Sequence, residues 1–136
     1  MNKQKLVSVY GTLRQGNGNH RLLANAEYKG TFTSQPVFNL FGKRCGFPKL
    51  KNGGNTPVVM EVYAVNDREA ANVDALEGYT EGEVPTFYDK QPIETPWGTA
   101  GVYIYVGEPS PNTLIETGDW MNQEIEVVVW KIMEFI

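Results

Sequence analysis

Glycine and proline divide this 136-residue chain into short segments, and this division constrains the fold more than any other feature of the sequence. The 14 glycines and eight prolines fall between most of the apolar runs. Both residues favour turns over the interiors of helices and strands. Short strands joined by turns are therefore expected. Because no linker and no internal repeat is visible, residues 1–136 are expected to form a single domain.

Most of the apolar segments are expected to be strands. They are rich in β-branched and aromatic residues and are bounded by turn residues. The segments are residues 5–10, 27–34, 37–42, 57–65, 87–95 and 99–106. The last two are joined by Pro96, Trp97 and Gly98, which predicts a hairpin. Residues 43–56 are expected to be irregular.

The clearest predicted helix covers residues 67–77. Asn66 is a favourable N-cap, and Glu69 follows three positions later, which is a variant of the capping box. Gly78 stands where a left-handed C-cap residue is needed. The sequence therefore predicts both ends of this helix.

Two further helices are expected, one near each end of the chain. Residues 19–25 favour a short helix with Asn19 as its N-cap. The apolar residues of the tail have helical spacing, which predicts a C-terminal helix over residues 119–136. Together with the meandering strands, these helices indicate an α+β fold built on a mixed, barrel-like sheet.

The charge and the ligand-forming residues exclude several classes of function. Twelve Lys and Arg against 16 Asp and Glu give a net charge of −4 without a basic run, so nucleic acid and anionic membrane surfaces are unfavourable partners. Cys45 is the single cysteine and His20 the single histidine, too few for a disulfide or a structural zinc site. No signal peptide and no apolar run of membrane-spanning length is recognisable, so a cytoplasmic protein is expected.

The first candidate site is the turn Tyr10-Gly11-Thr12-Leu13-Arg14. Where a strand runs into a glycine turn, successive backbone N–H groups can bind an anion. The turn is neither a P-loop nor a dinucleotide fingerprint. The simpler interpretation is a β-turn in which Gly11 adopts a positive φ.

The second candidate is Glu77. It shares one helical face with Ala70 and Val73, which are expected to face the core. Burial and the negative end of the helix dipole would both raise its pKa, as proton transfer near neutral pH requires. The alternative is that the helix frays and Glu77 turns to solvent. Asp74 lies off this face and is expected to be solvated.

The remaining candidates have simpler structural interpretations. Phe87, Tyr88, Tyr103 and Tyr105 are expected to lie mainly in the core, although a tyrosine hydroxyl could orient a ligand. His20 is expected to cap or pack, and Cys45 to be a passive thiol. Charged residues expected to be solvated are Arg14, Lys90, Glu81 and Glu83.

Several short motifs occur in an order and spacing that resemble the γ-glutamylcyclotransferase-like (AIG2-like) family. The resemblance covers about residues 5–122. The motifs are Val9-Tyr10-Gly11-Thr12-Leu13-Arg14 followed by Gly16 and Asn19-His20-x-x-Leu23, then Asp74-Ala75-Leu76-Glu77-Gly78-Tyr79, Tyr88-x-Lys90-x-x-Ile93, Ala100-x-Val102-Tyr103 and Ile115-Glu116-Thr117-Gly118-Asp119-Trp120. Lys90 stands where the family usually has arginine, and a lysine cannot form a bidentate ion pair.

The resemblance implies a small mixed β-barrel with flanking helices and an enzyme that needs neither metal nor cofactor. Enzymes of this family cyclise a γ-glutamyl group to 5-oxoproline and release the amine. The resemblance makes Glu77 the general acid/base and makes Tyr88 a wall of the cavity. It also assigns the γ-glutamyl-binding loop to Tyr10, Gly11, Thr12 and Leu13.

These observations favour an enzyme acting on a small γ-glutamyl amine or γ-glutamyl amino acid, as a monomer or homodimer. One alternative is a binding module that holds a small ligand in the same cavity without converting it. Another is an interaction protein that uses the C-terminal helix.

Overall fold

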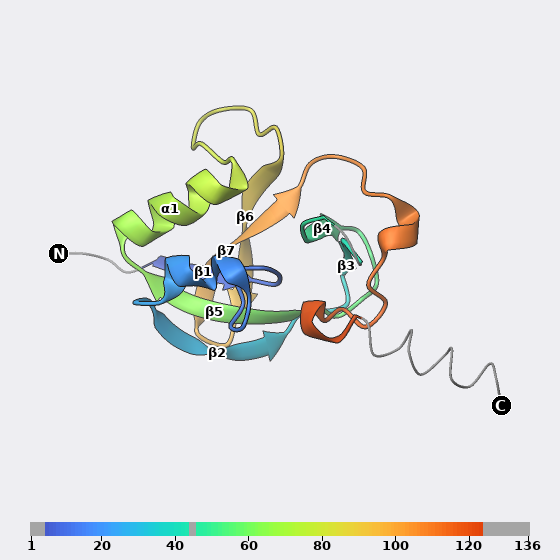
Figure 1. The fold of residues 1–136 in the computed structure, drawn as a ribbon, viewed down its shortest axis with the longest axis horizontal. Helices are drawn as coiled ribbons and strands as arrows, with labels where there is room; N and C mark the ends of the chain where they lie inside the picture. Colours follow the sequence, from blue (N-terminus) through green and yellow to red (C-terminus); the bar gives the residue numbers. More distant parts are fainter. Residues whose placement is uncertain (1–4, 44–45, 124–136) are drawn as a thin grey trace.

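The structure, a computed structural model, describes residues 5–43 and 46–123, which form a mixed α+β fold (Figure 1). One sheet contains five strands in the order β2-β5-β1-β7-β6, and β3 pairs with β4 separately. The strands are β1 (Lys5–Val9), β2 (Glu27–Thr33), β3 (Phe38–Phe41), β4 (Lys49–Asn52), β5 (Val59–Val65), β6 (Tyr88–Thr95) and β7 (Gly98–Tyr105). The helices are α1 (Asp67–Glu77) and the short 3-10 segments η1 (Gly18–Leu23), η2 (Pro111–Thr113) and η3 (Trp120–Asn122).

The five-stranded sheet is not closed into a barrel, so the expectation of a small mixed β-barrel is wrong in this respect. Strand β1 runs antiparallel to β5 and parallel to β7, whereas β2 pairs with β5 and β6 with β7. In the described part of the chain, β2 and β6 do not pair with each other. Pro92 lies within β6, and a proline cannot donate a hydrogen bond to a further strand. This residue favours an edge position for β6.

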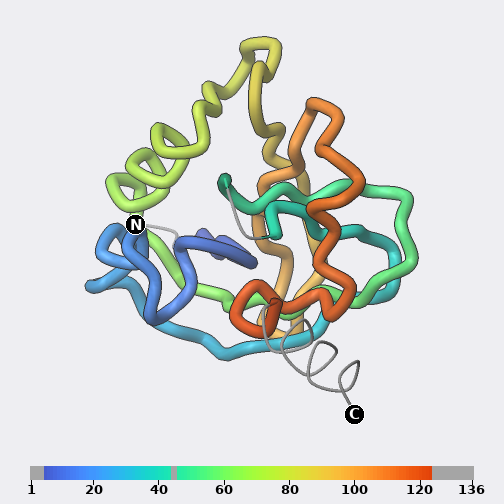
Figure 2. The backbone as a smooth tube through the Cα atoms, turned by 45° about the vertical axis from the view of Figure 1, so that its right-hand side comes forward, coloured from blue at the N-terminus to red at the C-terminus, as the bar shows by residue number. Residues whose placement is uncertain are grey.

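The two faces of the sheet are covered by different elements. Helix α1 and η1 pack on one face, and the β3–β4 hairpin packs on the other (Figure 1). Figure 2 shows the chain after β7 running past this hairpin, where the Ile115 amide donates to the Leu40 carbonyl at 2.7 Å. Alternate residues of β7 point to opposite faces of the sheet. Tyr103 belongs to the core cluster on the α1 side, and Val102 and Ile104 belong to the cluster on the side of the hairpin.

Helix α1 has the predicted bounds. The Asn66 side chain accepts from the Glu69 amide at 2.8 Å, and the Glu69 carboxylate accepts from the Asn66 amide at 2.9 Å. Gly78 ends the helix with φ 68°, in the left-handed region. Ala70 and Val73 are buried against the sheet. The face of α1 that carries Ala70 and Val73 therefore packs on the sheet, as the sequence predicts.

Three other expectations need correction or fall outside the structure. The segment expected as a helix over 19–25 is the 3-10 turn η1, and Asn19 does not cap it, because it lies inside the turn and Asn17 holds the N-cap position. The Asn19 side chain donates instead to Thr12 Oγ1 at 2.9 Å. Strand β4 lies within the stretch expected to be irregular. Of the expected helix over 119–136, residues 124–136 lie outside the described residues. Within the described ranges, no helix has the length and apolar character needed to cross a bilayer.

Candidate functional site

The loop after β1 is held very close to Pro48. Tyr10, at its start, is buried and donates from its hydroxyl to the Tyr103 carbonyl at 2.6 Å. A Cβ on Gly11 would lie only 2.1 Å from Cγ of Pro48. Gly11 is not among the residues with positive φ. The prediction that Gly11 adopts a positive φ is therefore wrong. A glycine is needed at this position because Pro48 lies too close to leave room for a side chain.

The same loop contains backbone donors that make no hydrogen bond to the described protein. The Arg14 amide donates to the Gly11 carbonyl at 2.9 Å and closes the turn. Within the described residues, the amides of Gly11, Thr12 and Leu13 donate no hydrogen bond to the protein. Successive free amides of this kind can bind a carboxylate or an oxyanion. His20 supports the loop from behind, since its Nδ1 lies 2.9 Å from the Leu13 carbonyl oxygen and its ring packs against Tyr63.

Glu77 is the last residue of α1 and borders the same hollow as this loop. Burial raises the pKa of its carboxyl to about 7. Among the described residues, no hydrogen bond or ion pair reaches this carboxyl group. Helix α1 extends through Glu77 to its cap at Gly78, and the side chain is half-buried, so the alternative in which the helix frays and Glu77 turns to solvent is wrong. Unsatisfied by the protein, the carboxyl is free to exchange a proton with a bound molecule.

Two spaces have Glu77 in their lining. The inner hollow, of about 20 Å³, has room for roughly one water-sized group. It is lined by Ser8, Val9, Tyr10, Gly11, Thr12, Leu13, Pro48, Glu77 and Tyr103. The outer cavity, of about 320 Å³, is lined by Thr12, Asn19, Phe47, Pro48, Ala75, Leu76, Glu77, Gly78, Phe87 and Tyr88. Every predicted site residue borders one of the two spaces, and Thr12 and Glu77 border both.

Two tyrosines near Glu77 have hydroxyls that are already engaged. The Tyr88 hydroxyl donates to the Pro48 carbonyl at 2.6 Å, and the Tyr103 hydroxyl donates to Asp74 at 2.5 Å. Burial, followed by the charge of Glu77, raises the pKa of Tyr88. Burial also raises the pKa of Tyr103, with smaller contributions from Asp74 and then Glu77. Both phenols therefore stay neutral and shape the site without exchanging protons.

Asp74 and Lys90 were expected to be solvated, and both expectations are wrong. Lys90 donates from Nζ to Asp74 Oδ1 at 3.1 Å, and each side chain is only about a quarter exposed. Asp74 also accepts from the Tyr103 hydroxyl, so this acid holds the ring of Tyr103 in place. The lysine thus forms an ion pair at the position where the family usually has arginine.

A buried ionic cluster behind the loop was missed by the sequence analysis. Arg14, expected to be solvated, is buried and donates to Glu61 at 2.9 Å and to Asp119 at 2.7 Å. Glu61 also accepts from the Gln15 amide at 2.9 Å and from the Tyr63 hydroxyl at 2.8 Å. The sequence does contain a sign of this cluster: Glu61 is the one charged residue in the apolar segment 57–65, and a charge in a buried strand needs a partner.

Other candidates lie away from this chemistry. Phe87, expected in the core, is 57% exposed, whereas Tyr88 and Tyr103 are buried. Glu81 and Glu83 are exposed, as expected, and Cys45 lies outside the described residues. Across residues 5–43 and 46–123, no three His, Cys, Asp or Glu side chains converge in the manner of metal ligands.

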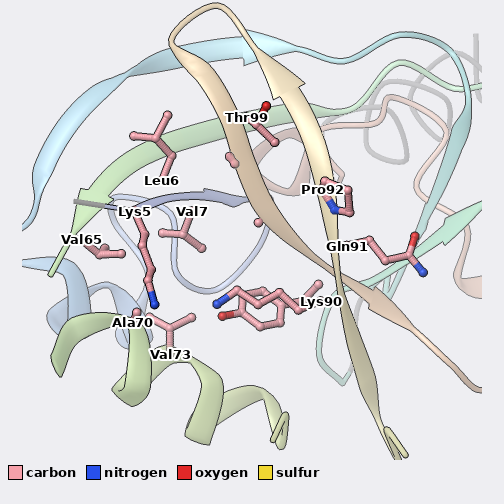
Figure 3. A pocket seen from close by; sticks show the side chains of 13 residues that line it. Lys5, Leu6, Val7, Val65, Ala70, Val73, Lys90, Gln91, Pro92 and Thr99 are labelled. Carbon is pink, nitrogen blue, oxygen red and sulfur yellow. The ribbon is translucent and has the colours of Figure 1, made fainter. Parts of the chain in front are cut away.

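A larger cavity, of about 530 Å³, lies between α1 and strands β1, β6 and β7 (Figure 3). Glu77 does not line it, and Tyr103 borders both this cavity and the inner hollow. Lys5 and Lys90 extend into it above Ala70 and Val73 (Figure 3). Both lysines have acidic partners, Asp67 at 3.7 Å and Asp74 at 3.1 Å. The candidate site is therefore the smaller pair of spaces at Glu77, where an unpaired carboxyl meets unused amides.

Comparison with known proteins gives consistent matches over most of the chain. The family model for gamma-glutamyl cyclotransferase, AIG2-like, matches residues 7–122. A putative gamma-glutamylcyclotransferase of Vibrio cholerae is 40% identical over 117 residues, which is 86% of this chain and 96% of that protein. The gamma-glutamylcyclotransferase family protein YtfP of Escherichia coli is 33% identical over 120 residues, covering 87% and 97% of the two chains.

Solved structures have the same fold. The solution structure of Escherichia coli ytfP matches with a TM-score of 0.65 at 33% identity, covering 88% of this chain and 98% of that one. An uncharacterized protein of Pyrococcus horikoshii matches with a TM-score of 0.74 at 24% identity, covering 91% and 96%. A mouse AIG2-like protein matches with a TM-score of 0.65 at 21% identity, covering 81% and 82%. For the Pyrococcus horikoshii and mouse proteins, the similarity concerns the fold alone.

Proposed function

The chain belongs to the AIG2-like gamma-glutamyl cyclotransferase family, and we propose that it converts a small γ-glutamyl compound to 5-oxoproline and a free amine. One observation carries the proposal: the half-buried Glu77 carboxyl, with its pKa raised to about 7, borders a hollow together with the loop whose amides at residues 11–13 are unused. In this mechanism the protein supplies one proton-transfer group and a set of oriented donors.

The nucleophile is the substrate's own α-nitrogen. It attacks the γ-carbonyl carbon, a five-membered ring closes, and the bond from that carbon to the leaving nitrogen breaks. The α-nitrogen starts as an ammonium and loses two protons, while the leaving nitrogen gains two and departs as an ammonium. Because the attack is intramolecular, correct folding of the substrate alone gives an effective molarity on the order of 10⁵ M or more.

Glu77 moves the protons. An ammonium has no lone pair, so a base must remove a proton before the nitrogen can attack. A carboxyl with a pKa near 7 is partly ionised at neutral pH, so it can accept this proton and then return it to the leaving nitrogen. Its position between the inner hollow and the outer cavity supports contact with both nitrogens.

The loop after β1 holds the γ-glutamyl group. The amides of Gly11, Thr12 and Leu13 are the donors for an oxygen of the substrate that enters the inner hollow. Tyr10 fixes the start of the loop through its bond to the Tyr103 carbonyl. Tyr88 supplies an apolar wall, because its hydroxyl is already bonded to Pro48.

Replacement of Glu77 tests the proposal directly. Glu77→Gln keeps the shape of the side chain but cannot exchange protons, so 5-oxoproline formation from γ-glutamyl amides and γ-glutamyl amino acids is expected to fall by at least about 10²-fold. The matched control is Glu81→Gln, an exposed acid on the following loop, which should leave the rate unchanged.

Two outcomes would contradict the proposal. Full activity of Glu77→Gln would remove this residue from the mechanism. A wild-type protein whose melting temperature rises with γ-glutamyl compounds, but which forms no 5-oxoproline from any of them, would be a binding module instead of an enzyme.

A further inference from the structure

The cavity of about 530 Å³ between α1 and strands β1, β6 and β7 has no part in the proposed proton transfers (Figure 3). Its volume falls within the range of roughly 300–1,000 Å³ that is usual for small-molecule sites. Five of its lining residues are apolar and buried: Val7, Val65, Ala70, Val73 and Ala100. The cavity is therefore suited to a small molecule with an apolar body.

The cavity lies where β1 and β7 pair over a very short stretch. Among the described residues, the parallel partners in these two strands are Val7 and Gly101 alone. The residues just before this pair line the cavity: Lys5 and Leu6 in β1, and Thr99 and Ala100 in β7. The space therefore belongs to the architecture of the sheet and does not depend on the placement of one side chain.

The charged groups in the lining are two lysines. Among the described lining residues, Lys5 and Lys90 carry a charge, and none is acidic. Figure 3 shows Lys5 extending from β1 and Lys90 reaching across from β6, with both ammonium groups turned into the cavity. Two cations beside an apolar space favour a ligand that carries an anionic group.

Lys90 is held in place and still has hydrogen-bond donors to spare. A Cβ on Gly101 would lie 2.8 Å from Lys90 Cε, so the stem of the lysine occupies the space that a side chain would fill. Its Nζ donates to Asp74 Oδ1 at 3.1 Å and lies 5.7 Å from the ring centroid of Tyr103. An ammonium has three N–H donors, so two of them have no acceptor within the part of the chain that the structure describes.

Lys5 is less engaged than Lys90. Its Nζ lies 3.7 Å from Asp67 Oδ1, which is too long for a hydrogen bond, and its side chain is 63% exposed. Asp67 and Asp74 do not line the cavity, although each offsets part of the charge of its lysine. The remaining positive potential suits a ligand with a single negative charge.

We propose that this cavity is a second ligand site, separate from the candidate active site, and that it binds a small monocarboxylate with an apolar body. The carboxylate accepts hydrogen bonds from the ammonium groups of Lys5 and Lys90, and the apolar body packs between α1 and the sheet. Glu77 and the loop residues 11–13 do not line this cavity, so the site is independent of the proposed cyclisation.

Three probes separate the contribution of the charge from that of the apolar body. 4-Phenylbutyrate has both features, 4-phenylbutyramide is a neutral analogue of nearly the same shape, and butyrate lacks the ring. In calorimetric titrations of the wild type, the Kd of 4-phenylbutyrate is expected to be at least about tenfold lower than that of either other probe. Equal affinities for 4-phenylbutyrate and its amide, or no binding of 4-phenylbutyrate, would overturn the inference.

Replacement of each lysine by methionine removes the charge and keeps an apolar stem. Lys90→Met is expected to weaken binding of 4-phenylbutyrate about tenfold, and Lys5→Met about threefold because its ammonium is more exposed. The matched control is Lys29→Met, since Lys29 is also paired with an acid, is 30% exposed and does not line the cavity. Equal effects of Lys90→Met and Lys29→Met would contradict the proposed contact.

A second pair of variants keeps both lysines and their ion pairs. Thr99 is exposed and lines the cavity. Thr99→Glu and Thr99→Gln add side chains of nearly the same size that differ in charge. Thr99→Glu is expected to weaken binding of 4-phenylbutyrate about fivefold relative to Thr99→Gln and to leave the amide within about twofold. Equal binding of 4-phenylbutyrate by the two variants would count against the site.

Amide NMR signals locate the bound probe. 4-Phenylbutyrate is expected to shift the signals of Val7, Ala70 and Val73, and to leave those of Thr12 and Leu13 unchanged. Shifts confined to Thr12 and Leu13 would place the probe in the candidate active site and overturn the inference. These measurements do not depend on 5-oxoproline formation, so they give a result whether or not the proposed cyclotransferase activity is found.

Discussion

At the scale of single residues, the position of Glu77 determines its chemistry. The side chain follows Ala70 and Val73 on the inward face of α1, yet it lies in the last turn, where the helix meets a hollow instead of a packed core. It is therefore buried enough to disfavour its charge and still accessible to a ligand. Functional carboxyls commonly combine these two properties.

The pH dependence of activity should report this carboxyl. Because Glu77 must be ionised to accept a proton, kcat/KM for 5-oxoproline formation is expected to rise with pH and to level off above about 7. A pH profile of kcat/KM with a γ-glutamyl amide measures the midpoint. A midpoint near 4.5, the usual value for a glutamate, would mean that the essential carboxyl is not buried.

The stability of the protein should depend on the same group. Folding raises the pKa of Glu77 from about 4.5 to about 7, so the folded state binds the proton more tightly than the unfolded state. The contribution of Glu77 to the free energy of unfolding is therefore most favourable below about pH 4.5, falls as the pH rises from about 4.5 to 7, and is lower by up to about 3 kcal/mol above that range.

Glu77→Gln removes this dependence. We expect the variant to melt at a higher temperature than the wild type at pH 8, with the difference shrinking towards pH 5. Thermal unfolding at both pH values measures the effect. Glu81→Gln is the control and should show no such difference, and an equal shift at both pH values would contradict the linkage to Glu77.

At the scale of elements, the loop after β1 depends on a close contact with the segment that leads into β4. Gly11→Ala would place a Cβ 2.1 Å from Pro48 Cγ, so the loop must move away. Loss of stability by about 1–3 kcal/mol and loss of most activity are expected. The second variant, Gly11→Ala with Pro48→Gly, removes the clashing ring and should regain part of both. Denaturant unfolding and 5-oxoproline assays check this, and no recovery in the double variant would contradict a purely steric cause.

The buried ionic cluster links the same loop to β5 and to the segment near Asp119. Arg14→Met leaves Glu61 buried without its cation, which is expected to lower the free energy of unfolding by about 3–5 kcal/mol. Lys5→Met breaks an exposed pair with Asp67 and should cost less than about 1 kcal/mol. Denaturant unfolding of both variants measures the difference. Similar small losses would show that the cluster contributes little to stability.

The elements also show how much of the fold could be predicted from the sequence. Helix α1 was predicted to the residue, because its capping residues act locally. Sheet closure was predicted wrongly, because it depends on whether β2 and β6 meet, which no local pattern encodes. The burial of Arg14 and the exposure of Phe87 were missed for the same reason, since each depends on partners distant in the sequence.

At the scale of the whole molecule, strand β1 lies at the centre of the sheet and leads directly into the candidate site. It pairs with β5 on one side and β7 on the other, whereas β2 and β6 form the edges. Amide hydrogen exchange should therefore be slowest in β1 and β5, at rates set by global unfolding, and faster in β2 and β6. Exchange measured by mass spectrometry checks this order. Faster exchange in β1 than in β6 would contradict it.

The parallel pairing of β1 with β7 has a consequence for the newly made protein. The Tyr10 hydroxyl donates to the carbonyl of Tyr103, a residue 93 positions later, and Tyr103 lines the inner hollow together with the loop. Such distant contacts form late because closing a long loop of chain is entropically costly. A nascent polypeptide on the ribosome already contains the loop and Glu77 while this wall has yet to be translated. Turnover would therefore begin only after synthesis has passed β7.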